Sequence, residues 1–372
     1  MKIFALILAL LMLFGCSAEE PQNKPEEVFK KEADEVIEKT EELDKKPVPE
    51  KLNFGLEDFG ATVLGQVQFL GDELIYVYAY NKDEGDDAGF LTTISKAVLP
   101  TEEVEILHEG RAFMEYSQVM RVSEVALSND WVYTGKEIFS ASFGDGEDMV
   151  YELDGEVSDQ DFCFDTQKIF YITGEGKTKI AAKAVAYDQE MEIYEHKGSE
   201  HEFINGISVS PDGEYIVFMV CNYTAMSPQK LVCIDYLGNL IFEEEAAEYF
   251  NFQMRWRNCT EFVLFYYDTD SGISAAKVFG YNGEVKNEFP LEFFPQTVQN
   301  SIGKSSPYVL ICETVEKAHF SYRLWVLNLE SGDYEEVYTS PTNGIIRGFD
   351  LSDGGKTAVW IENDDIMKMD IR

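Results

Sequence analysis

"GISVSPDGEYIVFMV" (206–220) is the stretch that decides the fold, because it places a tight turn between two runs of β-forming residues. Pro211 restricts φ, and Gly213 can adopt the positive φ that a tight reversal needs. Apolar and polar residues alternate before the turn, whereas a continuous apolar run follows it. The pattern predicts a β-hairpin with residues 215–220 as its second strand.

The hairpin recurs along the chain, which indicates an internal repeat. "GFDLSDGGKTAVWIE" (348–362) copies it, and "EVALSNDWVYTG" (124–135) and "FCFDTQKIFYIT" (162–173) are weaker copies. The β-rich central runs of the repeat occupy residues 74–80, 131–135, 168–173, 215–220, 262–267, 308–313 and 358–362, with start-to-start spacings of 57, 37, 47, 47, 46 and 50 residues.

A second hairpin follows most central runs and completes a unit of four strands. Its turns are found in "ELDGEV" (152–157), "DYLGNL" (235–240), "GYNGEV" (280–285) and "NLESGDYEEV" (328–337). Glycine paired with Asn, Asp or Ser between apolar runs is a strong hairpin signal. Four short strands in about 45 residues are typical of a propeller blade. The sequence therefore predicts an all-β fold, a β-propeller of seven four-stranded antiparallel blades, with six or eight blades left open.

The last unit ends early, because "DDIMKMDIR" (364–372) supplies only its third strand. We expect the N-terminal stretch "LNFGLEDFGATV" (52–63) to supply the fourth, since closing the ring in this way removes an exposed sheet edge. The first spacing, 57 residues, fits an inserted loop, "NKDEGDDAG" (81–89).

The turn motifs resemble those of TolB-type propeller repeats, which occur in bacterial envelope proteins. Ser210-Pro211-Asp212-Gly213 matches that repeat in full, and Ser352-Asp353-Gly354-Gly355 matches it without the proline. The resemblance implies a propeller body over residues 55–372 or so. Its motifs are structural turns and imply no catalytic residue.

The chain begins with Lys2 and an uninterrupted apolar run, Ile3–Phe14. A bilayer-spanning helix needs roughly 20 apolar residues, so this shorter run indicates a secretory signal. The run ends in Leu13-Phe14-Gly15-Cys16, which resembles the bacterial lipobox. The resemblance implies cleavage before Cys16 and attachment of a diacylglycerol and usually a further acyl chain at that residue. An ordinary cleaved signal with a chance cysteine is the alternative.

We therefore expect a signal peptide at 1–15, a lipidated Cys16 with a charged tether at 16–53, and the propeller at 54–372. Residues 26–46 of the tether carry apolar side chains three and four apart, which is typical of a partly helical spacer. A partner-binding helix is the alternative. The body would lie outside the cytoplasm in the cell envelope, held at the membrane by its lipid.

The composition argues against nucleic acid as a partner. The net charge is −39, and only 12 of the 69 acidic residues precede residue 54, so the body itself is acidic. Such a surface repels phosphate backbones. Hydrophobic residues at 45% and aromatic residues at 13% are too abundant for a disordered chain. We expect a monomeric body.

Five cysteines follow Cys16, an odd number that cannot pair fully within the chain. Most lie in apolar runs, where cysteine behaves as a small buried hydrophobe. Cys221 and Cys233 flank one hairpin, so a disulfide between them stays open. No two cysteines have CxxC spacing, so a thiolate zinc site is not indicated.

Candidate ligand-binding residues come from aligning the repeats at the start of their first strands. The aligned residues are Ser123, Gln160, Asn205 and Arg347, all polar. In so acidic a body, Arg347 would suit an anionic ligand group. No common catalytic or nucleotide-binding motif is present, and no cofactor or metal site is predicted. Oxygen ligands in 81–89 and 144–148 leave a structural Ca²⁺ open.

These features favour a non-catalytic binding or scaffold module for a protein, a peptide or an envelope glycan. The alternative is an envelope glycan hydrolase or lyase that uses carboxylates of the central channel. A third hypothesis is a sensor lipoprotein whose tether helix contacts a membrane partner. The sequence leaves open whether the protein is an enzyme.

Overall fold

The computed structural model describes residues 47–371, apart from 87–88, 113–116, 122–128, 135–136, 143–148, 153–158, 164–165, 167, 185–188, 225–226, 247–248, 269–270, 300–305, 317–319 and 342. The residues from Val48 onward form one compact unit. The expected signal peptide, Cys16 and the tether up to residue 46 lie outside the described residues.

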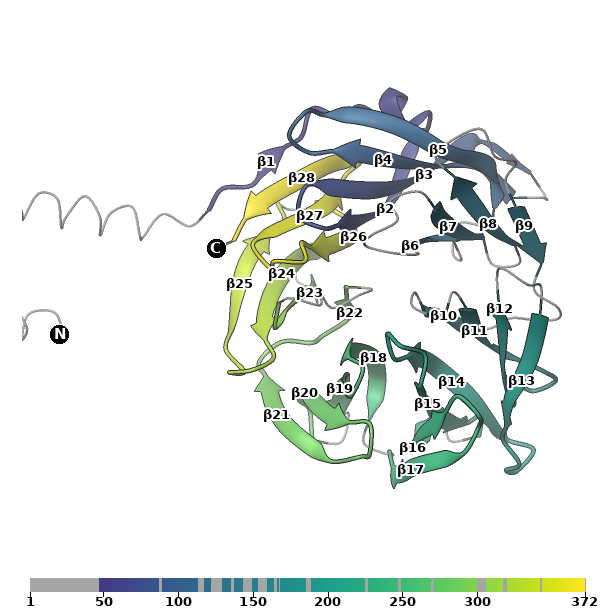
Figure 1. Ribbon diagram of the computed structural model, residues 1–372. Coiled ribbons are helices and arrows are strands. Elements are labelled where there is room, and N and C mark those ends of the chain that lie inside the picture. The colour runs from purple at the N-terminus through teal and green to yellow at the C-terminus, as the bar shows by residue number, and fades with distance from the viewer. Residues whose placement is uncertain are drawn as a thin grey trace, which may run out of the picture. The chain divides into compact units, whose positions relative to one another are not determined.

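Within these residues the strands form seven four-stranded sheets, or blades, that follow one another around a ring (Figure 1). Blade 1 contains β2 (Val63–Leu70), β3 (Leu74–Asp86), β4 (Gly89–Val98) and β5 (Glu103–Ala112). Blade 2 contains β6 (Ser117–Arg121), β7 (Asn129–Thr134), β8 (Glu137–Ser142) and β9 (Met149–Glu152). Blade 3 contains β10 (Asp159–Cys163), β11 (Lys168–Thr173), β12 (Lys179–Ala184) and β13 (Gln189–Glu195).

The later blades are built in the same order, from the inner strand to the outer one. Blade 4 contains β14 (Glu202–Val209), β15 (Tyr215–Asn222), β16 (Ser227–Asp235) and β17 (Leu240–Glu245). Blade 5 contains β18 (Phe250–Asn258), β19 (Glu261–Asp268), β20 (Ile273–Gly280) and β21 (Val285–Leu291). Blade 6 contains β22 (Thr297–Val298), β23 (Tyr308–Glu316), β24 (Phe320–Asn328) and β25 (Tyr334–Thr339). Blade 7 contains β26 (Ile346–Leu351), β27 (Thr357–Glu362), β28 (Asp365–Asp370) and β1 (Glu50–Lys51).

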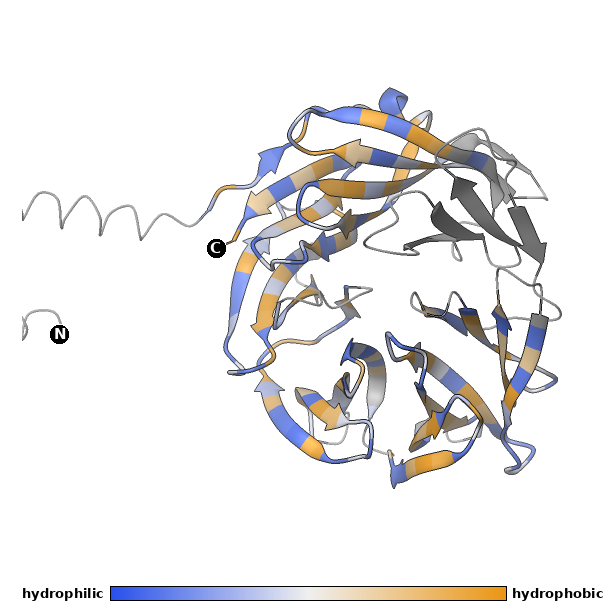
Figure 2. Cartoon of the chain, viewed as in Figure 1, coloured by the Kyte–Doolittle hydropathy of each residue, from blue (hydrophilic) through white to orange (hydrophobic). Residues whose placement is uncertain are grey.

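The predicted fold is confirmed. Each of the seven predicted central runs is the second strand of a blade, and every strand pairing is antiparallel, as in the β14–β15 and β15–β16 pairs. The central strand β15 is buried from Ile216 to Cys221, because its sheet packs between two neighbouring sheets. Outer strands such as β21 are largely exposed, and Figure 2 shows both hydrophilic and hydrophobic residues along them.

Alternate residues of a central strand pack against opposite neighbours, which follows from the two-residue period of a strand. On β15, Phe218 packs in one apolar cluster with Phe170 of blade 3. Val217 and Met219 pack in another cluster with Phe262 of blade 5. The core is therefore a series of layers between blades, and each central strand contributes to two of them.

The Ser210–Gly213 turn is held by its own side chains. Ser210 Oγ donates to Asp212 Oδ1 at 2.6 Å and accepts the Tyr215 amide at 2.9 Å. Gly213 has φ +74°, and a Cβ there would lie 3.0 Å from the Cys163 sulfur of blade 3. The glycine is thus required both by the turn and by its contact with the neighbouring blade.

The predicted closure of the ring is confirmed, with a shifted boundary. β1 pairs with β28 as the outermost strand of blade 7, so the N-terminal side of the body completes the last sheet (Figure 1). The closing strand is Glu50–Lys51, just before the expected stretch 52–63, which continues as the 3₁₀ helix η1 (Leu56–Phe59) and the start of β2. Leu52 extends the contact, since its amide donates to the Ile366 carbonyl at 2.9 Å.

The structure differs from the sequence prediction at the expected loop 81–89, and it settles the state of Cys221 and Cys233, which the sequence left open. The expected inserted loop at 81–89 is mostly an extension of the β3–β4 hairpin, with Asp86 paired to Gly89. Cys221 and Cys233 carry free thiols, because β15 and β16 place Cys221 opposite Pro228 and Cys233 opposite Val217. Burial raises the pKa of Cys221 to about 11 and that of Cys233 to about 12, so both thiols stay protonated.

Candidate functional site

The inner strands of blades 4 and 7 carry the same irregularity. A β-bulge interrupts β14 between Asn205 and Ile207, and another interrupts β26 between Ile346 and Phe349. Gly348 lies in the second bulge, and a Cβ there would lie 2.5 Å from the Gln66 Cα of blade 1. Only glycine allows β26 and β2 to approach so closely.

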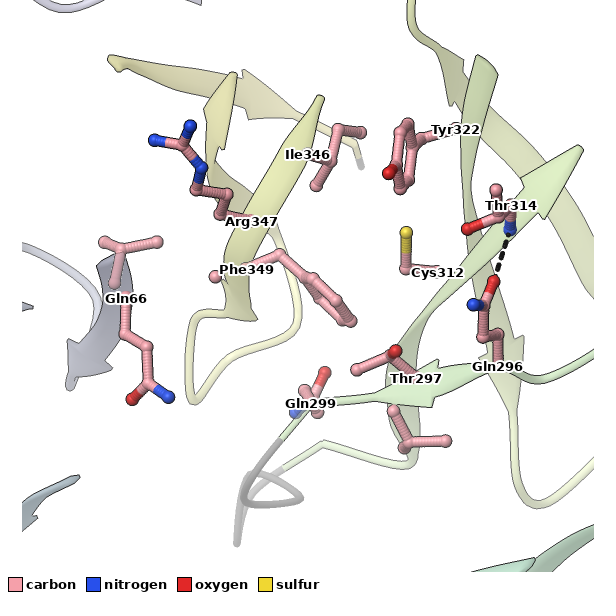
Figure 3. A pocket seen from close by; sticks show the side chains of 13 residues that line it. Gln66, Gln296, Thr297, Gln299, Cys312, Thr314, Tyr322, Ile346, Arg347 and Phe349 are labelled. Carbon is pink, nitrogen blue, oxygen red and sulfur yellow. Dashed lines mark hydrogen bonds between the residues drawn. The ribbon is translucent and has the colours of Figure 1, made fainter. Parts of the chain in front are cut away.

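A pocket of about 310 Å³ lies beside this bulge, between the inner strands of blades 6, 7 and 1. Its volume is at the lower end of the range of about 300–1,000 Å³ that is usual for small-ligand sites. The lining residues are Gln66, Val67, Gln296, Thr297, Val298, Gln299, Cys312, Thr314, Tyr322, Ile346, Arg347, Gly348 and Phe349. Figure 3 shows Phe349, Cys312 and Tyr322 directed toward a common space from three different strands.

The pocket exists because the inner strand of blade 6 is short. β22 pairs only Thr297 and Val298 with β23, whose nine residues continue to Glu316. Pro295, just before β22, has no N–H to continue the pairing, so the strand does not extend further toward its N-terminal side. The Gln296 side chain takes its place, since its Oε1 accepts the Thr314 amide at 3.0 Å (Figure 3).

The lining combines uncharged hydrogen-bonding groups with an apolar wall. Tyr322, Thr297 and Thr314 contribute hydroxyls, and Gln66 and Gln296 contribute amides. The apolar wall is formed by Ile346, Phe349 and Cys312, which are 6%, 9% and 6% exposed. Burial raises the pKa of the Cys312 thiol to about 12, so this thiol is an apolar group of the wall and no nucleophile.

Arg347 is the charged residue of the lining, and it is already paired. Its guanidinium contacts Asp364 Oδ1 and the Leu64 carbonyl, while the Leu64 amide donates to the same Asp364 oxygen at 3.2 Å. In Figure 3 the guanidinium points away from the space between Phe349 and Tyr322. The pair therefore links blades 7 and 1, and its charge is balanced by a carboxylate.

The structure brings one of the four sequence-predicted ligand residues to the pocket, namely Arg347. Gln160 lies half-buried on β10 opposite Tyr171, and Asn205 lies exposed on β14 opposite Met219. Neither lines the pocket, because blades 3 and 4 are remote from the blades that form it. Ser123 lies outside the described residues.

Sequence reasoning missed the polar residues of blade 6. The available signal was Pro295 in "FFPQTVQN" (293–300), since a proline directly before an inner strand shortens that strand. It missed Gln66 and Tyr322 because they come from β2 and β24, far apart in the chain. No local pattern relates residues that only the closed ring brings together.

The inner strands also carry carboxylates that bind the next blade. Asp159 Oδ2 accepts the Ile207 amide and Asp161 Oδ2 accepts the Val209 amide, both at 2.8 Å, joining blades 3 and 4. Burial raises the pKa of Asp159, despite these hydrogen bonds. The same burial lowers the pKa of the nearby Arg255 guanidinium, while Asp159 and Asp161 favour its charged form.

Asp350 has the same role where the ring closes. Its Oδ2 accepts the Phe69 amide of blade 1 at 2.8 Å, and the residue is 4% exposed. Burial raises the pKa of this carboxyl to about 8. These carboxyl groups are therefore parts of the contacts between blades.

Neither a metal site nor a membrane span is found in the part of the chain that the structure describes. There, no three His, Cys, Asp or Glu side chains are grouped so that they could hold a metal ion. The side chains of 82–90 and the whole of 144–148, considered for Ca²⁺, are not described. No described helix is long and apolar enough to cross a bilayer.

Comparison with solved structures identifies the fold. The β-propeller domain of Myceliophteria thermophila Cps50 (Swd1) covers 83% of this chain and 99% of its own, with a TM-score of 0.55 and 10% identity. The chain has a β-propeller fold. The alignment with a chain of the mitotic checkpoint complex covers 96% of this chain and 97% of that chain, with a TM-score of 0.51 and 11% identity. The alignment with the WD40 domain of fission yeast SCAP covers 88% of this chain and 98% of that chain, with a TM-score of 0.52 and 7% identity. No protein family and no curated protein matches the sequence.

Proposed function

We propose that the protein is a lipid-anchored binding module of the cell envelope, whose propeller recognises a partner outside the cytoplasm. The pocket between blades 6, 7 and 1 carries this proposal, because it offers uncharged hydrogen-bonding groups on an otherwise strongly acidic body. The anchor rests on the lipobox-like residues 13–16, and the envelope location is further supported by the TolB-like turns. A protein, a peptide or an envelope glycan would be the ligand.

The alternative of a glycan hydrolase or lyase needs carboxylates at the bound substrate. The lining of the pocket contains none. The carboxyl groups of the inner strands, Asp159, Asp161 and Asp350, accept hydrogen bonds from amides of the next blade. A binding role therefore accounts for the pocket better than catalysis does.

Two variants of the full chain test the proposal. Cys16→Ser should abolish labelling by radioactive palmitate and release the protein from membranes, and membrane attachment unchanged by this substitution would overturn the anchor. Thr297→Tyr fills the pocket from an exposed position of β22. In pull-downs from envelope extract, the wild type should enrich a component that the Thr297→Tyr chain loses while its unfolding temperature is kept. Equal enrichment by both chains would contradict binding through the pocket.

A further inference from the structure

The groups that line the pocket define the chemistry of its ligand. Within the lining, Arg347 alone is charged, and it pairs with Asp364. No carboxylate or lysine is present to bind a cation, and the net charge of −39 repels an anion. The ligand that fits is uncharged, and it offers several groups that both donate and accept hydrogen bonds.

The polar groups of the pocket are available to such a ligand. Among the described residues, no hydrogen-bond partner is present for the Tyr322 hydroxyl, the Thr297 hydroxyl or the Gln66 amide. Gln296 uses its oxygen for the Thr314 amide, which leaves its NH₂ group to donate. Hydroxyls and amides thus surround the space on several sides.

The geometry of the pocket favours a sugar over an extended peptide as its ligand. A peptide that adds to a sheet edge needs a row of free main-chain donors and acceptors. Here β22 and the Gln299 main chain already pair with β23 from Leu310 to Cys312, and the next inward-facing amide, at Thr314, is bonded to Gln296. A pocket of about 310 Å³ suits one or two sugar units, whose hydroxyls match the separate side-chain groups.

The apolar wall adds a second requirement. Ile346, Phe349 and Cys312 lie together at one side of the space, and none of them offers a charged or strongly polar atom. A small apolar substituent on the ligand would be buried against them. Hydroxyls, an amide and a methyl group occur together in an N-acetylated amino sugar.

We propose that the pocket between blades 6, 7 and 1 binds an uncharged N-acetylated hexosamine unit of a glycan, with its hydroxyls toward Tyr322, Thr297 and Gln66 and its acetyl methyl toward Phe349. This inference rests on the proposed binding function and specifies its ligand. It fails independently of that function, because a protein partner could be captured by the same pocket while no sugar binds.

Calorimetry with the full chain in detergent tests the proposal, with the disaccharide of N-acetylglucosamine as the probe. The acetylated disaccharide should bind, while cellobiose, which lacks the acetamido group, and the cationic deacetylated disaccharide should each bind at least tenfold more weakly. Absence of binding, or equal binding of cellobiose, would overturn the inference. Binding of a neutral capped peptide in place of the sugar would also overturn it, and would leave the proposed function intact.

Matched variants locate the binding. Tyr322→Phe removes one hydroxyl and should weaken the sugar about 2- to 10-fold, as expected for one hydrogen bond. Tyr223→Phe removes an exposed hydroxyl in blade 4 and should leave the affinity unchanged. Thr297→Tyr should abolish binding. Sugar binding that Tyr322→Phe and Thr297→Tyr leave unchanged would show that the sugar binds elsewhere and would overturn the assignment.

Discussion

Blades 4 and 7 use the same backbone for different purposes. "INGISVSPDG" (204–213) and "IRGFDLSDGG" (346–355) form the same bulged inner strand and the same serine-capped turn. They differ at three positions of the inner strand. Asn205, Ile207 and Ser208 of blade 4 correspond to Arg347, Phe349 and Asp350 of blade 7. The three residues of blade 7 bind blade 1 or line the pocket.

The two blades also differ in their outer strands. Blade 4 is contiguous in the chain, and Leu240 on its outer strand β17 is 59% exposed. Blade 7 takes its outer strand from the N-terminal side, and Leu52 beside that strand is 5% exposed. The repeat thus fixes the sheets, whereas the ring closure and the pocket depend on residues that depart from it.

The largest expected effect concerns Asp350, whose blade 4 counterpart Ser208 does not titrate. An unfolded aspartate has a pKa of about 3.9, whereas burial raises the pKa of Asp350 to about 8. Between these values the folded chain keeps a proton that the unfolded chain has lost, so the free energy of unfolding falls as pH rises. The fall is on the order of 6 kcal/mol over the whole window, at about 1.4 kcal/mol per pKa unit.

Asp350→Asn keeps an oxygen for the Phe69 amide and removes the titration. Urea unfolding at pH 5 and pH 8 should show a much smaller difference in stability for this variant than for the wild type. Ser208→Ala is the matched control and should keep the wild-type difference. An unchanged pH dependence in Asp350→Asn would contradict the raised pKa.

The second effect concerns the outer strands. Leu52→Ala removes a buried side chain from the cluster that contains Val359 and Ile366 of blade 7, and should cost about 2–5 kcal/mol of stability. Leu240→Ala on β17 removes an exposed side chain and should change stability by about 0.5 kcal/mol or less. Thermal and urea unfolding measure both. Similar costs for the two variants would show that β1 does not hold the ring closed.

A smaller effect is expected at the serine-capped turns. Ser210→Ala loses hydrogen bonds of 2.6 and 2.9 Å, to Asp212 and from the Tyr215 amide, and should cost about 1–2 kcal/mol. Ser352→Ala loses longer ones, from the Thr357 amide at 3.2 Å and the Lys356 amide at 3.3 Å, and should cost about 0.5–1 kcal/mol. Urea unfolding ranks the two. A larger cost for Ser352→Ala would mean that Pro211 stabilises the turn of blade 4 more than the Ser210 hydrogen bonds do.

The smallest effect is expected for Arg347→Asn, which places the blade 4 residue in blade 7. The pair with Asp364 is partly exposed, at 33% and 29% of the two side chains, so solvent screens it. Its loss should cost about 0–1 kcal/mol. Unfolding at low and at high salt measures the difference, which should shrink as salt is added. A cost that salt does not reduce would show that Arg347 acts through packing.

Most of the fold could be predicted because it is encoded locally. Turn residues such as Gly213 and Gly355 mark the hairpins, and continuous apolar runs such as 215–220 mark the buried strands. The short last unit indicated closure by the N-terminal side. The exact position of the closing strand could not be predicted, because β1 has only two residues and neither is apolar.

The pocket could not be predicted to the same extent. Its walls come from β2, β22, β23, β24 and β26, so its lining spans residues 66 to 349 and follows no local pattern. The alignment found Arg347 because that residue occupies a repeated position. It could not show that Asp364 would neutralise the guanidinium, since Asp364 lies in a turn of the neighbouring hairpin.

The two-residue strand β1 also sets the order in which the molecule can be completed. Glu50 and its partner Lys368 are 318 residues apart, so β1 has no partner until residues 365–370 of β28 have been synthesised. Contacts of such long sequence separation form slowly. Until then blade 7 lacks β28 and β1, so the edge of β27 that pairs with β28 is open. A nascent or truncated chain that lacks β28 therefore cannot close the ring. Its unpaired strand edge makes it prone to aggregation.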